Sequence, residues 1–109
     1  MDCLFCRIIA GETPSNKRAE SENVLAFDDI NPSAQTHILV IPKKHINSFA
    51  EIDDTDEKTM FDLMDTIKNL IDKFNLNDGY KVVINGGKYQ HISHLHWHLL
   101  GGRLEKMPE

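Results

Sequence analysis

Three histidines alternate with apolar residues in the run from His94 to Gly102. Side chains of a strand alternate between its two faces, so His94, His96 and His98 share one face. The run therefore predicts a strand over 94–100 whose other face packs on a core. Three imidazoles about 7 Å apart suit a metal site or nucleophilic and acid–base chemistry. The alternative is a solvated strand face, which normally carries Thr, Lys and Glu rather than repeated His.

A central histidine flanked on the same face by two others is well placed for attack on phosphorus. A neutral imidazole is a usable nucleophile at cellular pH when a hydrogen bond at one ring nitrogen leaves a lone pair on the other. Flanking histidines can orient a phosphate or protonate a leaving group. Gly101 and Gly102 either let the backbone approach a ligand or a partner chain closely or end the strand in a turn.

Composition sets limits on the class of protein. With 109 residues and 40% hydrophobic content the chain suits one domain over residues 1–109. A net charge of −5 disfavours non-specific binding to nucleic acid or to an anionic membrane. The first residues lack the pattern of a signal peptide, and no apolar run is long enough to span a membrane, so we expect a cytoplasmic protein. Its two cysteines are then expected to stay reduced or hold a metal.

Hydrophobic periodicity predicts an α+β fold on an antiparallel sheet. Strands are expected over 24–27, 37–41, 80–85 and 94–100, and a short helix over 8–14 that stops at Gly11 and Pro14. A long helix is expected from Thr55 to Phe74, with a capping box at Asp54 and Glu57. Its buried stripe is predicted to consist of seven apolar residues: Met60, Leu63, Met64, Ile67, Leu70, Ile71 and Phe74.

The chain resembles the histidine triad family, and within it the small nucleotide-binding, purine phosphoramidase branch. The triad motif with its following Gly-Gly-Arg matches residues 94–103. Residues 5–14 resemble the family's N-terminal segment, and residues 25–30 and 36–45 resemble its two central motifs. Together these segments cover nearly the whole chain in the family's order.

The resemblance implies a five-stranded antiparallel sheet with one long helix and a short N-terminal helix, pairing into a ten-stranded sheet in a homodimer. It implies hydrolysis of purine nucleoside phosphoramidates, or of related nucleoside monophosphate conjugates, through a nucleotidyl-histidine intermediate, with no metal needed for the chemistry. The alternatives are a dinucleoside polyphosphate hydrolase or nucleotidyl transferase of the same fold, a nucleotide sensor with incidental catalysis, and a protein with catalytic zinc on all three histidines.

The resemblance also assigns roles to residues. His96 is the expected nucleophile, and His98 is expected to contact the phosphate and assist the leaving group. The expected substrate-binding residues are Ile8, Phe27, Asp29, Ile30, Asn85, Gln90 and His91. Taken without the resemblance, Phe27 and Ile30 could equally be core residues, Asp29 a turn residue and Asn85 a cap at a strand end. His37 is either a polar edge residue or a hydrogen-bonding support.

Cys3 and Cys6 form a Cys-x-x-Cys pair. By itself the pair could be a redox site, two inert small hydrophobic residues or half of a zinc site. The resemblance implies structural zinc held by Cys3, Cys6, His45 and His94. His94 would then be a metal ligand that braces the catalytic strand rather than a catalyst.

Overall fold

The computed structural model describes residues 3–104, and the predicted α+β class is confirmed. The regular elements, in chain order, are α1 (Leu4–Ile9), β1 (Lys17–Glu20), β2 (Val24–Asp28), β3 (Ala34–Pro42), α2 (Glu57–Lys73), β4 (Tyr80–Ile84) and β5 (Trp97–Leu104). Three short 3-10 turns lie in the connections: η1 (Phe49–Glu51), η2 (Asp54–Asp56) and η3 (Gly87–Tyr89). No helix within this part of the chain has the length and apolar character needed to cross a membrane.

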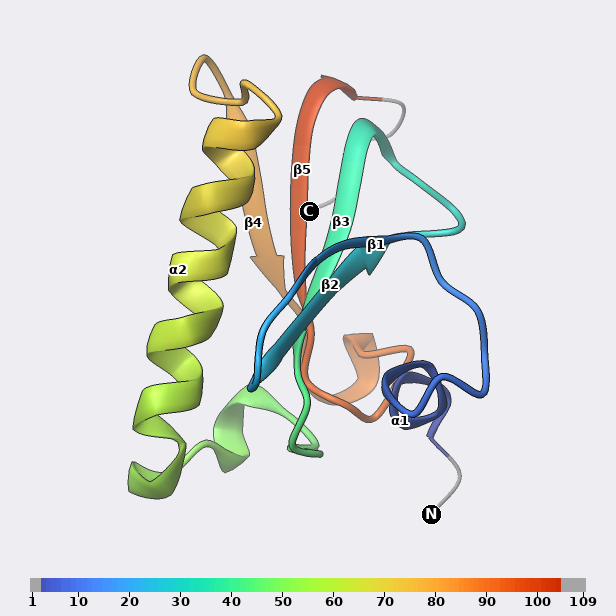
Figure 1. The fold of residues 1–109 in the computed structure, drawn as a ribbon, viewed down its shortest axis with the longest axis vertical. Helices are drawn as coiled ribbons and strands as arrows, with labels where there is room; N and C mark the ends of the chain where they lie inside the picture. The colour runs from blue at the N-terminus through green and yellow to red at the C-terminus, as the bar shows by residue number, and fades with distance from the viewer. Residues whose placement is uncertain (1–2, 105–109) are drawn as a thin grey trace.

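The five strands form one antiparallel sheet in the order β1-β2-β3-β5-β4. The long helix α2 runs along one side of this sheet, while α1 lies at the other side near the N-terminus (Figure 1). The central strand β3 is covered on both faces, and its residues 37–42 are all buried. The sheet therefore has two cores, one under each helix.

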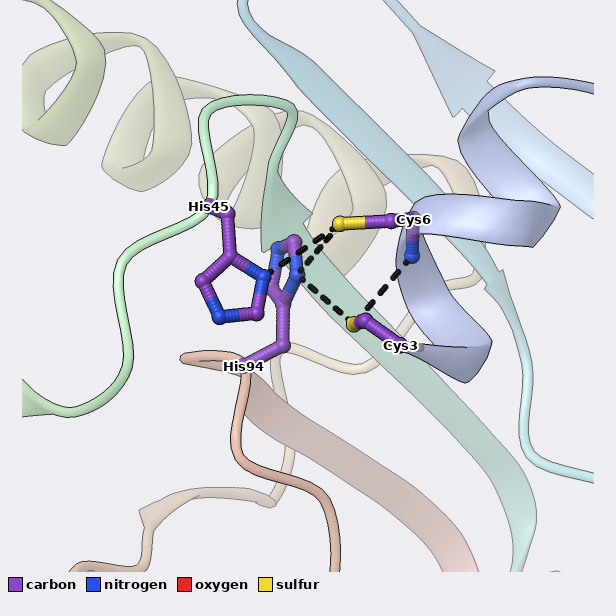
Figure 2. Close-up of side chains that lie close together, drawn as sticks. All are labelled: Cys3, Cys6, His45 and His94. Carbon is purple, nitrogen blue, oxygen red and sulfur yellow. Dashed lines mark hydrogen bonds between the residues drawn. The ribbon is translucent and has the colours of Figure 1, made fainter. Parts of the chain in front are cut away.

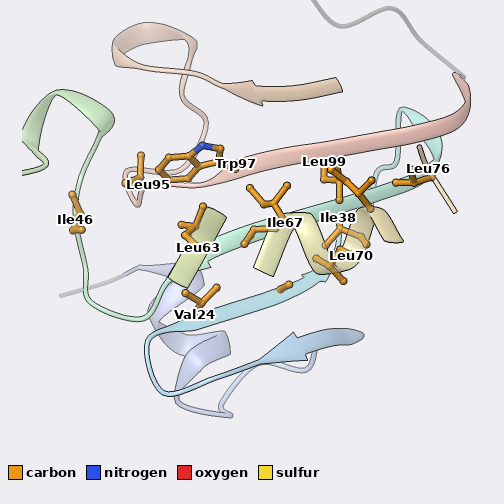
Figure 3. Packing of buried hydrophobic residues seen from close by; sticks show 13 residues of the cluster. Val24, Ile38, Ile46, Leu63, Ile67, Leu70, Leu76, Leu95, Trp97 and Leu99 are labelled. Atoms are coloured by element: carbon orange, nitrogen blue, oxygen red, sulfur yellow. The ribbon is translucent and has the colours of Figure 1, made fainter. Parts of the chain in front are cut away.

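The larger core lies between the sheet and α2 (Figure 3). Side chains at alternate strand positions point to this side, and they pack against Leu63, Ile67 and Leu70 of the helix. The strand residues of this core are Val24, Ala26, Ile38, Val40, Trp97 and Leu99. The intervening residues Leu25, Phe27, Leu39 and Ile41 pack with α1 on the other face. This alternation places His96 and His98 on the α1 side of the sheet.

The predicted long helix is confirmed, but three of its details differ. The capping box is formed by Asp53 and Asp56 around η2, not by Asp54 and Glu57. The Asp53 side chain accepts the Thr55 N–H (2.9 Å), and Asp56 accepts the Asp53 N–H (3.1 Å). The α-helix itself therefore begins two residues later than expected. Met64 was expected in the buried stripe but is 56% exposed, because it lies at the edge of the stripe rather than over the sheet.

A cap at the C-terminus of α2 determines where the helix ends. Asn75 takes a left-handed conformation (φ 56°), and the Leu76 N–H returns to the Ile71 carbonyl (2.9 Å). These are the marks of a Schellman cap. Leu76 and Ile71 are both buried in the larger core. The cap thus turns the chain from α2 towards β4.

The other local differences lie near the N-terminus. The short helix runs over Leu4–Ile9 instead of starting at Ile8, because the Cys3 sulfur accepts the Cys6 N–H and so caps the helix earlier (3.4 Å). The prediction by periodicity also lacked β1. This four-residue edge strand has no buried residue, so its sequence carries no apolar alternation.

The last strand begins at Trp97, three residues later than predicted. Its ladder with β3 ends at the pair Val40–Trp97. Beyond this pair the Leu95 N–H donates to the Ile46 carbonyl of the loop (2.7 Å), and Pro42 has no N–H to offer. The alternation of side chains nevertheless continues through 94–96, since Leu95 is buried in the α2 core and His96 lines the opposite side.

Candidate functional site

A cavity of about 560 Å³ lies on the α1 side of the sheet. It is lined by strand residues, by α1 and by the loops that follow β2 and β4. The predicted catalytic and binding residues among its lining are Ile8, Phe27, Asp29, Ile30, Asn85, His91, His96 and His98. The fold thus gathers residues from five separate segments of the chain around one space.

His96 has the ring form that a nucleophile needs. Its Nδ1 lies 2.7 Å from the His94 carbonyl oxygen, which can only accept, so Nδ1 donates and Nε2 keeps a lone pair. Phe5 of α1 packs edge-on against the ring at a centroid distance of 5.2 Å. Burial lowers the pKa of His96, because an imidazolium ion is poorly solvated there. The neutral form with a free Nε2 lone pair is therefore favoured near pH 7.

His98 has the opposite ring form, and a chain of hydrogen bonds selects it. The Ser33 main-chain N–H donates to Nδ1 of His37 (2.9 Å), so a neutral His37 carries its hydrogen on Nε2. That Nε2–H donates to Nδ1 of His98 (2.9 Å), which leaves the hydrogen of His98 on Nε2. Burial, together with the neighbouring His96 and His37, lowers the pKa of His98 to about 4. The cavity therefore has one imidazole that can attack and one that can donate.

The four predicted metal ligands come together in a second cluster (Figure 2). Cys3 Sγ is 3.4 Å from His94 Nδ1, and Cys6 Sγ is 3.3 Å from His45 Nδ1 and 3.7 Å from His94 Nδ1. Ligand atoms at neighbouring corners of a tetrahedral zinc site lie about 3.4–3.8 Å apart. The cluster therefore has the size of a closed zinc site.

The ring forms of both histidines also fit a metal. His94 Nε2 donates to the Pro42 carbonyl (2.8 Å), and His45 Nε2 donates to Asn47 Oδ1 (2.7 Å). Each Nδ1 therefore has a lone pair, and it faces the two sulfurs. Ligating histidines in metal sites usually have such an outer hydrogen bond at the other ring nitrogen. The residues present thus fit zinc in number, distance and protonation.

Asp29, His37 and His98 also lie close enough to one another to hold an ion. The tautomer of His37 argues against a metal ion at this group. The Ser33 N–H occupies Nδ1 of His37, so its Nε2 carries a hydrogen and has no lone pair for a metal. His94 is in the cysteine cluster, apart from this group. The arrangement therefore does not support the alternative of catalytic zinc held by all three triad histidines.

Comparison with known proteins agrees with this architecture. The HIT domain family matches residues 10–105. The chain belongs to the HIT family. The family part of the resemblance seen in the sequence is thus confirmed, and the match covers the triad and both central motifs.

Individual HIT relatives match over nearly the whole chain. The 14 kDa zinc-binding protein of Zea mays is 42% identical over 109 residues, covering 96% of this chain and 85% of the maize protein. A HIT family hydrolase from Legionella pneumophila has a TM-score of 0.91 and 41% identity, covering 98% of each chain. A histidine triad protein from Clostridium difficile has a TM-score of 0.89 and 40% identity, covering 100% of this chain and 96% of that one.

The placement of individual residues refines the alternatives left open by the sequence. Ile30 is 89% exposed, so it is a residue of the cavity wall and not of the core. Phe27 is buried and packs edge-on against Phe5 at 5.6 Å while also lining the cavity. Asp29 is a turn residue, since its Oδ1 accepts the Asn31 N–H (2.9 Å), and it also lines the cavity, where its Oδ2 lies 3.4 Å from His37 Nε2.

Gln90 differs from the other predicted binding residues of this HIT protein, since it is absent from the cavity lining. Its Nε2 donates to the carbonyls of Asn47 (2.6 Å) and Ile92 (2.9 Å). It joins two loops instead of facing the cavity. Its neighbour His91 does line the cavity.

Three residues with clear roles were not predicted from the sequence. Ser33 orients His37 through its main chain, Phe5 packs on His96, and Asn47 holds the metal ligand His45. The main-chain contact has no sequence signal. Phe5 and Asn47 do lie within two residues of a predicted metal ligand, which is the one signal that could have drawn attention to them.

The low pKa of His98 predicts how stability changes with pH. An unfolded chain binds a proton at His98 below about pH 6.5, whereas the folded protein resists until about pH 4. The contribution of neutral His98 to the free energy of unfolding is thus complete above about pH 6.5 and is lost as the pH falls towards 4. Between pH 7 and pH 5 we expect His98 to account for a loss of about 2 kcal/mol in the free energy of unfolding.

Denaturant unfolding of the wild-type protein and of His98→Gln at both pH values checks this prediction. The variant should lose about 2 kcal/mol less than the wild type over this interval. The metal site is common to both proteins, so the difference reports on His98 together with the His37 ring that is bonded to it. Equal losses in the two proteins would contradict the prediction.

Proposed function

We propose that this protein hydrolyses purine nucleoside phosphoramidates, or related nucleoside monophosphate conjugates, through a nucleotide covalently attached to His96. The observation that carries the proposal is the pair of opposite ring forms. His96 presents a lone pair and its neighbour His98 presents an N–H, with ring centroids 5.1 Å apart. This is the combination that displacement at phosphorus needs. The chain belongs to the HIT family, and it is similar to a protein described as a HIT family hydrolase. Both findings support the proposal.

The first step transfers the nucleotide to the protein. As the bond from His96 Nε2 to phosphorus forms, the bond from phosphorus to the leaving nitrogen breaks. The leaving nitrogen keeps that electron pair and takes a proton from solvent, while the Nε2–H of His98 donates a hydrogen bond to it. The hydrogen bond from His37 to Nδ1 holds His98 in the ring form that makes this contact.

The second step releases the nucleotide. Water attacks the phosphorus and releases its proton to solvent. The bond between phosphorus and His96 breaks, which returns the electron pair to the ring. Both histidines then have their original forms, and the products are the amine and the nucleoside monophosphate. Asn85 is available to contact the phosphoryl group or the ribose.

The nucleoside would occupy the apolar end of the cavity. Ile8, Phe27 and Ile30 present flat or branched apolar surfaces that suit a purine ring. The Asp29 carboxylate lies on the same wall, where it can accept hydrogen bonds from ribose hydroxyls. These contacts bind the unreactive part of the substrate and so orient the phosphorus.

Incubation with an adenosine phosphoramidate tests the proposal. We expect release of adenosine monophosphate and, after rapid acid-free quenching, a protein mass increased by one adenylyl group. Binding without turnover would favour a nucleotide sensor. Faster cleavage of a dinucleoside polyphosphate would favour the other hydrolase of this fold.

Zinc at Cys3, Cys6, His45 and His94 is the second part of the proposal. The fit of distances and ring forms supports it, as does the relationship to a maize protein described as zinc-binding. Bound there, zinc would hold the N-terminus and the loop after β3 against the start of β5. It would contribute structure and take no part in the phosphoryl transfer.

A homodimer is the third part of the proposal. Tyr80, Val82 and Ile84 of the edge strand β4 are exposed, and Val82 pairs with Leu99 of the α2 core. This exposed row therefore lies on the sheet face that carries α2, where Phe61 and Met64 are exposed as well. A second copy paired along β4 would extend the sheet to ten strands and cover these residues.

Sedimentation at micromolar concentration checks the dimer. We expect a mass of about twice the 12.5 kDa of one chain. Val82→Lys should shift the protein towards the monomer, since two like charges would meet across the symmetry axis. A wild-type mass near 12.5 kDa would reject the dimer.

A further inference from the structure

The metal cluster and the cavity wall are joined by a short run of side-chain contacts. His45, one of the four cluster residues, donates from Nε2 to Asn47 Oδ1 (2.7 Å). The other end of the Asn47 amide donates to Glu51 (3.4 Å). A carboxylate only accepts, so this contact identifies which end of Asn47 is oxygen. The Asn47 side chain therefore orients the ring of His45 so that Nδ1 faces Cys6.

The main chain of Asn47 continues the connection. Its carbonyl accepts the Gln90 amide (2.6 Å), and the same amide nitrogen donates to the Ile92 carbonyl (2.9 Å). Gln90 therefore holds the segment 90–92 against the loop that carries His45. Within this segment His91 and Ile92 line the catalytic cavity.

A second contact ties the same two segments together. The Leu95 N–H donates to the Ile46 carbonyl (2.7 Å), directly beside the cluster residues His45 and His94. The loop after β3 and the chain entering β5 are thus joined at two points, once between Leu95 and Ile46 and once through Gln90. An ion bound by both His45 and His94 would restrain both segments at once.

We propose that Asn47 and Gln90 are positioning residues that couple the metal site to the catalytic cavity, so that metal binding and nucleotide binding strengthen each other. This proposal rests on the proposed zinc site and nucleotide site. Coupling between two sites is reciprocal, because each ligand must change the affinity of the other by the same factor. The effect can therefore be measured on zinc affinity alone, without any turnover.

The first experiment measures zinc affinity by competition with a chromogenic chelator. Asn47→Ala removes the acceptor of His45 and should weaken zinc binding by about 10–100-fold. Asn47→Asp keeps an acceptor for His45, although it replaces the hydrogen bond to Glu51 with a contact between two carboxylates, and it should recover at least part of the affinity that Asn47→Ala loses. Asn23→Ala is the matched control, since Asn23 bonds Asp62 of α2, away from the cluster. Equal zinc affinities in the wild type and Asn47→Ala would overturn the role of Asn47.

The second experiment repeats the titration with saturating adenosine monophosphate. In the wild type we expect the nucleotide to tighten zinc binding by about fivefold or more. Gln90→Ala should still bind both ligands, but the ratio of its zinc affinities with and without the nucleotide should fall towards one. Gln35→Ala is the control, because Gln35 accepts the Arg103 N–H at the far end of β3, and it should keep the wild-type factor.

The outcomes separate the proposals from one another. A wild-type protein that binds no zinc overturns the metal site and the coupling with it. A protein that binds zinc but no nucleotide overturns the proposed function and the coupling with it. Binding of both ligands with a factor near one, or an unchanged factor in Gln90→Ala, overturns the coupling alone.

Discussion

Replacing His96 with alanine should lower turnover of a nucleoside phosphoramidate by at least about a thousandfold. His96 has the lone pair that attacks phosphorus, because its Nδ1 is held as a donor to the His94 carbonyl. No other described histidine of the cavity has this ring form fixed by a carbonyl. The covalent adduct should also disappear, since its site of attachment is gone.

Nucleotide binding should change much less in the same variant. The apolar contacts of Ile8, Phe27 and Ile30 and the carboxylate of Asp29 remain. We therefore expect the dissociation constant of adenosine monophosphate to stay within about tenfold of the wild type, a difference of about 1.4 kcal/mol. Titration calorimetry and steady-state kinetics on one preparation measure both quantities.

His91→Ala provides the comparison for this experiment. His91 lines the same cavity but has no part in the hydrogen bonds that fix the two catalytic rings. Its loss should change KM more than kcat. If His96→Ala kept turnover within a factor of a few while losing nucleotide affinity, His96 would be a binding residue and the nucleophile assignment would be wrong.

The features that the sequence predicted well are those with a local period. Alternation by two placed Leu95, Trp97 and Leu99 in one core and the catalytic histidines on the other side of the sheet. The helical stripe of α2 was predicted in the same way, apart from Met64 at its edge. These patterns depend on residues a few positions apart, so a single sequence is enough to find them.

The boundaries of the elements depend on distant partners and were predicted less well. The start of β5 is set by where β3 stops pairing and by the Ile46 carbonyl. The start of α1 is set by the Cys3 sulfur, and β1 has no pattern of its own. The ring forms of His37 and His98 depend on a main-chain N–H at Ser33. None of these contacts has a signature in the spacing of residues.

The metal cluster illustrates the same limit. Cys3 and His94 are 91 positions apart, and spacing alone left the cysteine pair open to three interpretations. The resemblance to the family suggested the set of four, and the fold brings them together. Only the structure adds the outer partners Pro42 and Asn47, because hydrogen bonds between loops are not encoded by a motif.

Removing zinc should therefore lower the melting temperature more than it lowers activity at 25 °C. The four ligands come from three separated segments, and an unfolded chain has no preformed site, so binding free energy becomes folding free energy. Zinc at a thousand times its dissociation constant stabilises a fold by about 4 kcal/mol. For a domain of this size that corresponds to a melting temperature higher by about 15 °C or more.

Activity should respond less because the catalytic groups do not hold the metal. His96 and His98 keep their ring forms through the His94 carbonyl and through His37. Elemental analysis, melting curves with and without chelator, and initial rates on the same samples measure the three quantities. Cys3→Ser should melt like the chelated protein and show little further response to chelator.

Two results would defeat the structural role of zinc. The first is purified protein with no bound zinc and an unchanged melting curve after zinc is added. The second is chelation that abolishes turnover while leaving the melting temperature where it was, which would indicate zinc acting in the reaction. Cys3→Ser separates these cases, because Cys3 is buried in the cluster and is not among the residues that line the catalytic cavity. A lower melting temperature with retained turnover in this variant would place the metal's contribution in the fold.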